Sequence, residues 1–349
     1  HGYSLDGMPT SYRPPGYPLF LALVYRMFGV SMLAGQLANL VLAGLTVLLT
    51  GLLGRRLLSD RRGLMAAGMV AALPSLVLYP GLLASENLAL PLLLGGLGLM
   101  LRPATPAALG AGALLGLALL VRPALAVFPV AWVVAMRVYG KPLRFRFAAA
   151  AAAAAILVLT PWAIRNTQVQ NGFVPVSTNG GVNLAISFGP ESTGGFVDLD
   201  RAQFRTHPGA TELEIDREAR RRALQYVREN PAEVLRLAPK KLYYLLRDDV
   251  SGVTLAWKET RYDPPRWMYL GLLAACMAGY AALWLLALRG AWDLRRDRVL
   301  WLLAAPLAAC VLTHLVFFGD DRLHHPMLPF LALLAAAAPG WRRPANPTS

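Results

Sequence analysis

Ionisable side chains stand out in this sequence because long apolar stretches surround them. Glu86 is the only acidic residue between Gly63 and Pro142, and it directly precedes an apolar stretch. An ionisable group at the end of a membrane helix indicates a functional site by default, and the alternative is a carboxylate that caps the following helix. Arg165, just after Trp162, could pair with Glu86 or with an anionic ligand; the alternative is an interfacial anchor.

A second group of polar residues lies in the turn 319–326, which holds two acids, Arg322, His324 and His325. Arginine is always charged and can bind a phosphate through two parallel hydrogen bonds. The two histidines suggest a metal, but no third ligand is evident, so the metal is left unknown. Asn183, in an Asn- and Gly-rich loop, could contact a sugar or an acceptor, and simple turn chemistry is the alternative.

Two helices are expected in the polar segment 165–266. Thr211 and Glu214 form a capping box that starts the first, and its Arg220-Arg221-Arg222 run is interpreted as a solvated face paired with nearby acids. The second covers about 232–246 and places Lys240 and Lys241 beside leucines and tyrosines. This composition is typical of an interfacial helix, which either cradles a phosphorylated lipid or simply anchors through its lysines.

These residues must be positioned by a membrane protein. Of the 349 residues, 56% are hydrophobic and 15% charged, and the mean hydropathy is +0.45. Soluble domains are less apolar and carry about 25% charged residues, so a soluble enzyme is excluded. The net charge of +14 raises the question of nucleic acid, but in a membrane protein it reflects basic loops, and no nucleic-acid partner is expected. The two cysteines form no disulfide framework.

Nine apolar stretches are long enough, or nearly so, to cross a bilayer. They cover about 30–53, 64–80, 86–101, 107–121, 123–138, 147–164, 267–288, 299–318 and 326–340. Residues 107–138 could form one long helix or a hairpin that turns at Arg122-Pro123. The hairpin gathers fifteen basic residues of short loops on one side, which the positive-inside rule assigns to the cytoplasm. Glu86, Arg122, the segment 165–266 and the turn 319–326 then face outward.

The fold class is therefore an all-α polytopic membrane protein with interfacial helices and a mixed outer loop region. The expected parts are an outer juxtamembrane loop or interfacial helix (1–28), a transmembrane bundle of six spans (29–164), an outer-face loop region with amphipathic helices (165–266), three C-terminal spans (267–340) and a cytoplasmic tail (341–349). No Gly-x-x-x-x-Gly-Lys-Ser/Thr phosphate loop occurs, which argues against ATP-driven transport.

The order of several short motifs resembles the polyprenyl-phosphate-dependent glycosyltransferases of the GT-C superfamily, in the branch of the aminoarabinose transferases and protein O-mannosyltransferases. The resemblance runs from His1 to about Ala338. Its motifs are Tyr12-Arg-Pro-Pro-Gly-Tyr-Pro18, Ser85-Glu86, Leu120-Val-Arg-Pro123, Thr160-Pro-Trp-Ala-Ile-Arg-Asn166, Val174–Leu184, and Asp321-Arg322 with Pro326 and Pro329. Members begin with a further membrane helix and an outer loop whose Asp is the catalytic base. Both are expected upstream of His1, in an N-terminally truncated member.

The resemblance implies a single inverting displacement that moves a sugar from a polyprenyl-phosphate donor to a lipid, glycan or protein acceptor. It implies an active site on the periplasmic face of a bacterial cytoplasmic membrane. Glu86 would bind the acceptor, orient the missing base or hold a divalent cation, which is the one candidate cofactor. The leaving phosphate would meet basic residues, and the cavity would be shaped by polar neighbours. These are Arg322, Arg165, Lys240 and Lys241 for the phosphate, and Arg13, Tyr17, Asn166, Asn183 and His324 for the cavity.

Two other functions are compatible with a polytopic membrane protein. A secondary transporter or lipid flippase would carry polar residues near mid-membrane on broken helices and would show internal repeats. The span centres here are almost uncharged and polar residues gather on one face, which favours the glycosyltransferase. A non-catalytic scaffold is the third interpretation.

Overall fold

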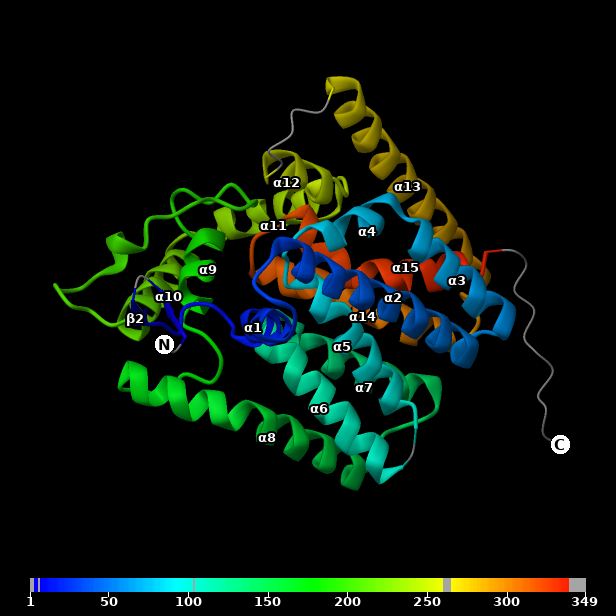
Figure 1. Ribbon diagram of the computed structural model, residues 1–349, viewed down its shortest axis with the longest axis horizontal. Coiled ribbons are helices and arrows are strands. Elements are labelled where there is room, and N and C mark those ends of the chain that lie inside the picture. The colour runs from blue at the N-terminus through cyan, green and yellow to red at the C-terminus, as the bar shows by residue number, and fades with distance from the viewer. Residues whose placement is uncertain (1–2, 6, 103, 260–264, 339–349) are drawn as a thin grey trace.

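The structure is a computed structural model that describes residues 3–5, 7–102, 104–259 and 265–338. Within these ranges the chain is mostly helical (Figure 1). One small antiparallel ladder joins β1 (Ser4–Leu5) to β2 (Met8–Pro9) across a turn in which Gly7 has φ +80°. The expected all-α class is confirmed, and the tail predicted for 341–349 lies outside the described residues.

Local sequence signals set where several helices begin. The side chains of Ser31 and Ser59 accept hydrogen bonds from backbone amides of the following turn, and Thr211 and Glu214 form the expected capping box. The first half of the chain forms α1 (Gly16–Phe28), α2 (Met32–Leu57), α3 (Asp60–Ala72), α4 (Pro74–Leu78), η1 (Tyr79–Gly81), α5 (Glu86–Met100), α6 (Thr105–Val121), η2 (Pro123–Ala126), α7 (Val127–Tyr139) and α8 (Phe145–Gln170). The second half forms α9 (Gly180–Ser187), η3 (Arg201–Phe204), α10 (Glu212–Glu229), α11 (Pro231–Leu246), α12 (Ser251–Glu259), α13 (Arg266–Asp293), α14 (Val299–Val316), η4 (Asp321–Met327) and α15 (Leu328–Ala335).

The nine expected membrane stretches all contain helix, but they differ in length. Among the described residues, α2, α8, α13 and α14 are long and apolar enough to cross a membrane, and Asp60–Gly81 is a fifth span if its halves, bent by 62°, count as one. The bend falls at Leu73-Pro74, where proline removes a helical hydrogen bond. The helices α1, α5, α6 and η2–α7 are apolar but shorter.

The last expected span, 326–340, differs most from its prediction. Its described helix, α15, has only eight residues, and all of them are buried. It packs against α13, α3, α14 and α2, so it forms the centre of the bundle and does not face lipid. The packing is close: a Cβ added to Gly290 would lie 1.8 Å from the Leu334 carbonyl oxygen.

The expected hairpin at Arg122 is confirmed by the neighbours of its two helices. The end of α6 lies beside the start of α1, because a Cβ on Gly16 would lie 2.8 Å from the Val121 backbone nitrogen. The end of α7 lies at the opposite end of the bundle, where Gly140 is next to Arg298. We call the end with Glu86, Arg122 and the segment 165–266 the loop end, and the end with Arg56, Arg298 and Gly140 the basic end.

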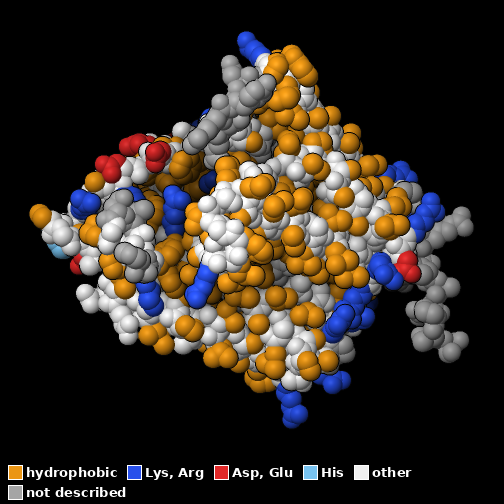
Figure 2. All heavy atoms as spheres, in the orientation of Figure 1, with side chains coloured by type: hydrophobic (Ala, Val, Ile, Leu, Met, Phe, Trp, Pro, Cys, Tyr) orange, Lys and Arg blue, Asp and Glu red, His pale blue; other side chains and the backbone are white. Residues whose placement is uncertain are grey.

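The helices of the polar segment gather at the loop end, where α11 and α12 pack against the bundle. In Figure 1, α9 and α10 lie at the left and α11 and α12 above, while α2, α3 and α13 run toward the right. Helix α8 continues to Gln170, beyond the expected end at 164, and carries Arg165 and Asn166 toward these helices. Figure 2 shows an apolar surface over the bundle, with basic side chains along its right and lower edges.

Candidate functional site

A buried ion pair lies at the loop end, where the start of α5 meets the turn after α6. Arg122 precedes Pro123, which favours an extended backbone, and it has φ −147° and ψ 101°. One Nη of Arg122 lies 2.6 Å from Glu86 Oε1, and these side chains are 18% and 6% exposed. The turn thus supplies the partner of Glu86, which sequence reasoning had sought in Arg165.

Several polar groups around this pair lack hydrogen-bond partners among the described residues. They are the Tyr79 hydroxyl, Arg322 Nε and His325 Nε2. The rings of Tyr79 and His325 lie 4.1 Å apart, and the Arg322 guanidinium adds positive potential at the Glu86 carboxylate. Buried polar groups normally have partners, so an unfilled set indicates room for a polar ligand or water.

Arg322 is the most available cation of this group. Its Nε lies 3.6 Å from Asp320 Oδ1, and its side chain is 41% exposed. Burial raises the pKa of Asp320, which weakens its hold on Arg322 as a counter-charge. The guanidinium can therefore bind an oxyanion that arrives at the loop end.

A second buried pair joins η4 to the segment between α11 and α12. His324 Nε2 lies 3.3 Å from Asp249 Oδ1, and both residues are almost fully buried. His324 Nδ1 lies 2.7 Å from the Leu245 carbonyl oxygen, so acceptors face both ring nitrogens. This favours the doubly protonated ring: burial opposes the charge, but the bond to Asp249 outweighs it and raises the pKa of His324. Burial alone would raise the pKa of Asp249, but the contact with His324 outweighs burial, and the pKa of Asp249 is lowered.

Asp321 of η4 also contacts the segment between α11 and α12. Its carboxylate accepts hydrogen bonds from the backbone amides of Val250 and Ser251, at 3.0 and 2.7 Å, and from the Ser251 hydroxyl. Asp249 also accepts a hydrogen bond from Ser75 in α4. We call Asp249, His324 and Asp321 the latch. Because Arg322 lies between two of its members, the latch fixes where Arg322 stands relative to Glu86.

The remaining predicted phosphate ligands lie away from Glu86. Arg165 donates to the carbonyl oxygens of Tyr3 and Thr10, at 2.7 and 2.5 Å, and its guanidinium lies over the Trp162 ring. Lys240 is exposed on α11. Lys241 was expected at a lipid-facing interface, but the structure places it in the interior. Its side chain is fully buried, and its ammonium caps the end of α14.

Lys241 Nζ donates to the carbonyl oxygens of Leu315 and Val316, at 3.1 and 3.4 Å. The last carbonyls of a helix have no partner within the helix, and a cation is favourable there. The ammonium also lies 3.5 Å from the centre of the Phe188 ring. Burial lowers the pKa of Lys241 to about 8.

The predicted cavity residues are also dispersed. Tyr17 is buried and donates to Asn39 Oδ1 at 3.0 Å, close enough to Glu86 to feel its charge. Asn166 is buried and bonds Ser11 and the Val176 carbonyl oxygen. Arg13 is exposed, and Asn183 lies half-buried in α9. We call Glu86, Arg122, Arg322 and His325 the Glu86 cluster. Of the predicted cavity residues, only Tyr17 and His324 lie near it.

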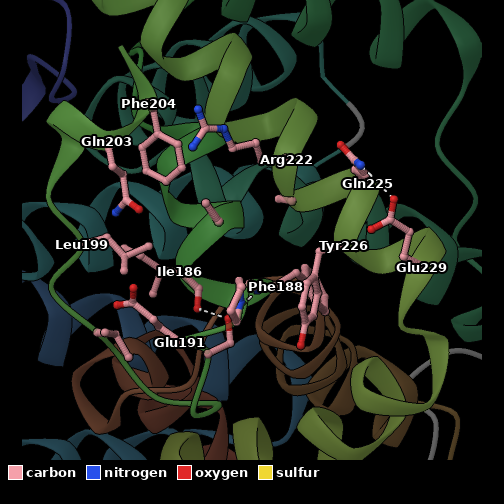
Figure 3. A pocket seen from close by; sticks show the side chains of 16 residues that line it. Ile186, Phe188, Glu191, Leu199, Gln203, Phe204, Arg222, Gln225, Tyr226 and Glu229 are labelled. Carbon is pink, nitrogen blue, oxygen red and sulfur yellow. Dashed lines mark hydrogen bonds between the residues drawn. The ribbon is translucent and has the colours of Figure 1, made fainter. Parts of the chain in front are cut away.

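Two further observations concern metal ligands and cavities. Within the described residues, no group of three or more His, Cys, Asp or Glu side chains is arranged to hold a metal ion. A cavity of about 290 Å³ lies away from Glu86, between α9 and α10 (Figure 3).

Comparisons with known proteins bear on both the fold and the family. Residues 12–164 match the family model described as dolichyl-phosphate-mannose-protein mannosyltransferase. A comparison with curated proteins gives no match. The structure resembles the oligosaccharyltransferase of Archaeoglobus fulgidus in the apo form, with a TM-score of 0.54 and 14% identity over 95% of this chain and 43% of that one.

The same enzyme tethered to an acceptor peptide containing the NVT sequon gives a TM-score of 0.53 and 15% identity, over 93% and 41% of the two chains. ArnT from Cupriavidus metallidurans, bound to undecaprenyl phosphate, gives 0.41 and 15%, over 95% and 68%; at that score the likeness supports no conclusion. This chain spans about two fifths of the length of the archaeal enzyme. The expected resemblance is confirmed: the chain is an all-α polytopic membrane protein that shares its fold with the archaeal oligosaccharyltransferase, and its residues 12–164 match the mannosyltransferase family model.

Proposed function

We propose that this protein is a membrane glycosyltransferase that moves a sugar from a polyprenyl-phosphate-linked donor to a lipid, glycan or protein acceptor. The observation that carries the proposal is the buried pair of Glu86 and Arg122 with Arg322 and His325 beside it. The matched family segment contains both members of the pair, and the archaeal oligosaccharyltransferase shares the fold.

The cluster has the charges that such a transfer requires. A leaving phosphate gains negative charge as the glycosidic bond breaks, and a cation already in place stabilises that charge. Arg322 is the available cation, whereas Arg122 is held by Glu86. Glu86, kept ionised by Arg122, would accept a hydrogen bond from the acceptor or hold a divalent cation. A carboxylate would act as the general base toward the acceptor, and the reaction would be a single displacement with inversion.

The first test measures sugar transfer by membrane vesicles that carry the full-length protein. The probe is polyprenyl-phosphate-linked [14C]mannose, and sugar released from the lipid is counted. Arg322→Ala should lower turnover at least tenfold, because charged hydrogen bonds contribute about 1.5–3 kcal/mol. Arg228→Ala, on an exposed position of α10, is the matched control and should leave turnover unchanged. Vesicles that move the lipid across the membrane without cleaving it would indicate the transporter or flippase instead.

A second test concerns sidedness. We propose that the loop end faces the exterior of a bacterial cytoplasmic membrane, because short basic loops gather at the other end. Both native cysteines are buried, so a single exposed cysteine can report its location. A membrane-impermeant maleimide should label Arg228→Cys in intact cells and should label Arg144→Cys only after the cells are opened. The reverse pattern would refute the orientation and the donor assignment with it.

A further inference from the structure

A cavity of about 290 Å³ lies in the polar segment, away from the Glu86 cluster. Its walls come from the end of α9, the loop 188–199, η3 and the second half of α10 (Figure 3). Its volume is near the lower limit of typical small-molecule pockets, which are mostly apolar with a few well-placed polar groups. None of the residues that line it was predicted as a site residue.

Helices α9 and α10, which both line the cavity, make one very close contact. At Gly181 an added Cβ would lie 1.9 Å from the Asp216 carbonyl oxygen, and the Gly181 amide donates to Asp216 Oδ1 at 2.5 Å. The loop after α9 is held by Ser192, whose hydroxyl bonds the Gly189 amide and the Ile186 carbonyl oxygen. The walls are therefore fixed by the protein's own hydrogen bonds before any ligand arrives.

Part of the cavity's lining is apolar and aromatic. Ile186 and Leu199 form its aliphatic part, and Phe188, Phe204 and Tyr226 contribute aromatic rings. The C–H face of a sugar ring packs well on such a surface, because it is the apolar face of an otherwise polar molecule. Aromatic side chains supply this kind of rigid apolar area together with, for tyrosine, a polar end.

The polar part of the lining contains one basic residue, Arg222, and its charge is already paired. Arg222 bonds Glu218 at 2.7 Å and lies over the Phe204 ring. Gln225 donates to Glu229 at 2.8 Å, as the dashed line in Figure 3 shows. An anionic ligand would thus meet carboxylates without a free counter-charge, and a phosphate is disfavoured.

Three polar groups at the cavity remain without side-chain hydrogen bonds to other described residues. They are the Glu191 carboxylate, the Gln203 amide and the Tyr226 hydroxyl. A carboxylate accepts hydrogen bonds, whereas an amide and a phenol both donate and accept. Together they match the alternating donors and acceptors of adjacent sugar hydroxyls.

We infer that this cavity binds a neutral saccharide ring and serves as a subsite for the acceptor glycan; its role as an acceptor subsite rests on the proposed function, whereas saccharide binding does not. A chain of contacts leads from the cavity wall to η4. Phe188 lies against the Lys241 ammonium, which bonds the last carbonyls of α14, and η4 with Arg322 begins five residues after α14 ends.

The test measures saccharide binding by the full-length protein in lipid nanodiscs. The probes are methyl α-D-mannopyranoside and α-1,2-mannobiose, and saturation-transfer NMR follows the sugar protons. Gln203→Ala and Tyr226→Phe each remove one hydrogen-bonding group at the cavity, and together they should weaken binding about tenfold. Gln168→Ala, at an exposed glutamine of α8, is the matched control and should bind like the wild type. Circular dichroism confirms that each variant is folded.

Several outcomes would overturn the inference. The absence of saturation transfer to either sugar, or binding that is unchanged in the folded double variant, would each do so. Displacement of a pocket-bound fluorescent dye by an apolar peptide but not by sugars would assign the cavity to a peptide side chain. Saccharide binding by a protein that cleaves no donor would refute the proposed function alone, and donor cleavage without saccharide binding would refute the subsite alone.

Discussion

Asp249→Asn tests whether the latch is a buried ion pair that holds η4 in place. The variant keeps the size of the side chain and the bond to Ser75 but removes the charge that faces His324. Breaking a buried pair by removing one partner typically costs about 3–5 kcal/mol. His324 can release its proton, however, which limits the loss, since each tenfold change in proton affinity corresponds to about 1.4 kcal/mol.

The effect should depend on pH in a direction that follows from both pKa shifts. The pKa of His324 is raised, so its contribution to stability is complete below the ordinary value of 6.5 and disappears as the pH rises through the raised pKa. The pKa of Asp249 is lowered, so its contribution is present above the ordinary value of 3.8 and is lost as the pH falls. We expect Asp249→Asn to lower the free energy of unfolding by about 1–3 kcal/mol at pH 6 and by clearly less at pH 9.

The assay is denaturant unfolding of the purified protein in detergent, at pH 6 and pH 9, with sugar transfer measured in parallel. Asp198→Asn, at an exposed acid of the same segment, is the control and should change neither. A loss of stability that is equal at both pH values would refute a charged His324. If stability falls at pH 6 but transfer does not, the latch does not position Arg322.

Three further predictions concern single contacts. Glu86→Gln should destabilise the protein by about 3–5 kcal/mol, because it leaves Arg122 buried without its counter-charge. The double variant with Arg122→Gln should recover part of this loss in a double-mutant cycle. Additive losses would contradict the pairing. Lys241→Met should cost more in denaturant unfolding at pH 10 than at pH 7. Burial lowers the pKa of Lys241 from 10.5 to about 8, so the unfolded chain holds the proton more tightly than the folded one, and the wild type alone gains stability as the pH rises through this window. An equal cost at both pH values would show that the proton affinity of Lys241 does not differ between the folded and unfolded chains. Gly181→Ala should lower the melting temperature because its Cβ would clash with α10, whereas Gly68→Ala, with open space around it, should not; equal melting temperatures would contradict the close contact of α9 and α10.

Most of the fold could be predicted from composition and periodicity. Apolar stretches of membrane length, the capping box at Thr211 and the charge balance that placed a turn at Arg122 all report on local or summed properties of the sequence. Such properties do not distinguish a helix that faces lipid from one that lies inside a bundle. For that reason α15, an apolar stretch like the others, was predicted to span the membrane when its described helix is short and buried.

The site could be predicted only in part, for the same reason. Glu86 stood out because a charge beside apolar residues is unusual, but its partner was set by which turn meets the start of α5. Lys241 has the pattern of an interfacial lysine, and only tertiary packing shows that the end of α14 receives it. Asp249 carries no local signal, because an acid is ordinary in a polar loop, and the turn 319–326 showed that Asp321 is present but not that it contacts Ser251. His325 was noted in the sequence, but its place beside Tyr79 was not.

The central position of α15 has a consequence for how the protein is made. A ribosome delivers α2, α3, α13 and α14 before it delivers α15, yet these four helices pack around it. Until α15 emerges, these four helices lack the eight apolar residues on which they pack. Membrane insertion must therefore leave the early helices loosely associated, and a stop codon shortly before Leu328 would remove the middle of this bundle.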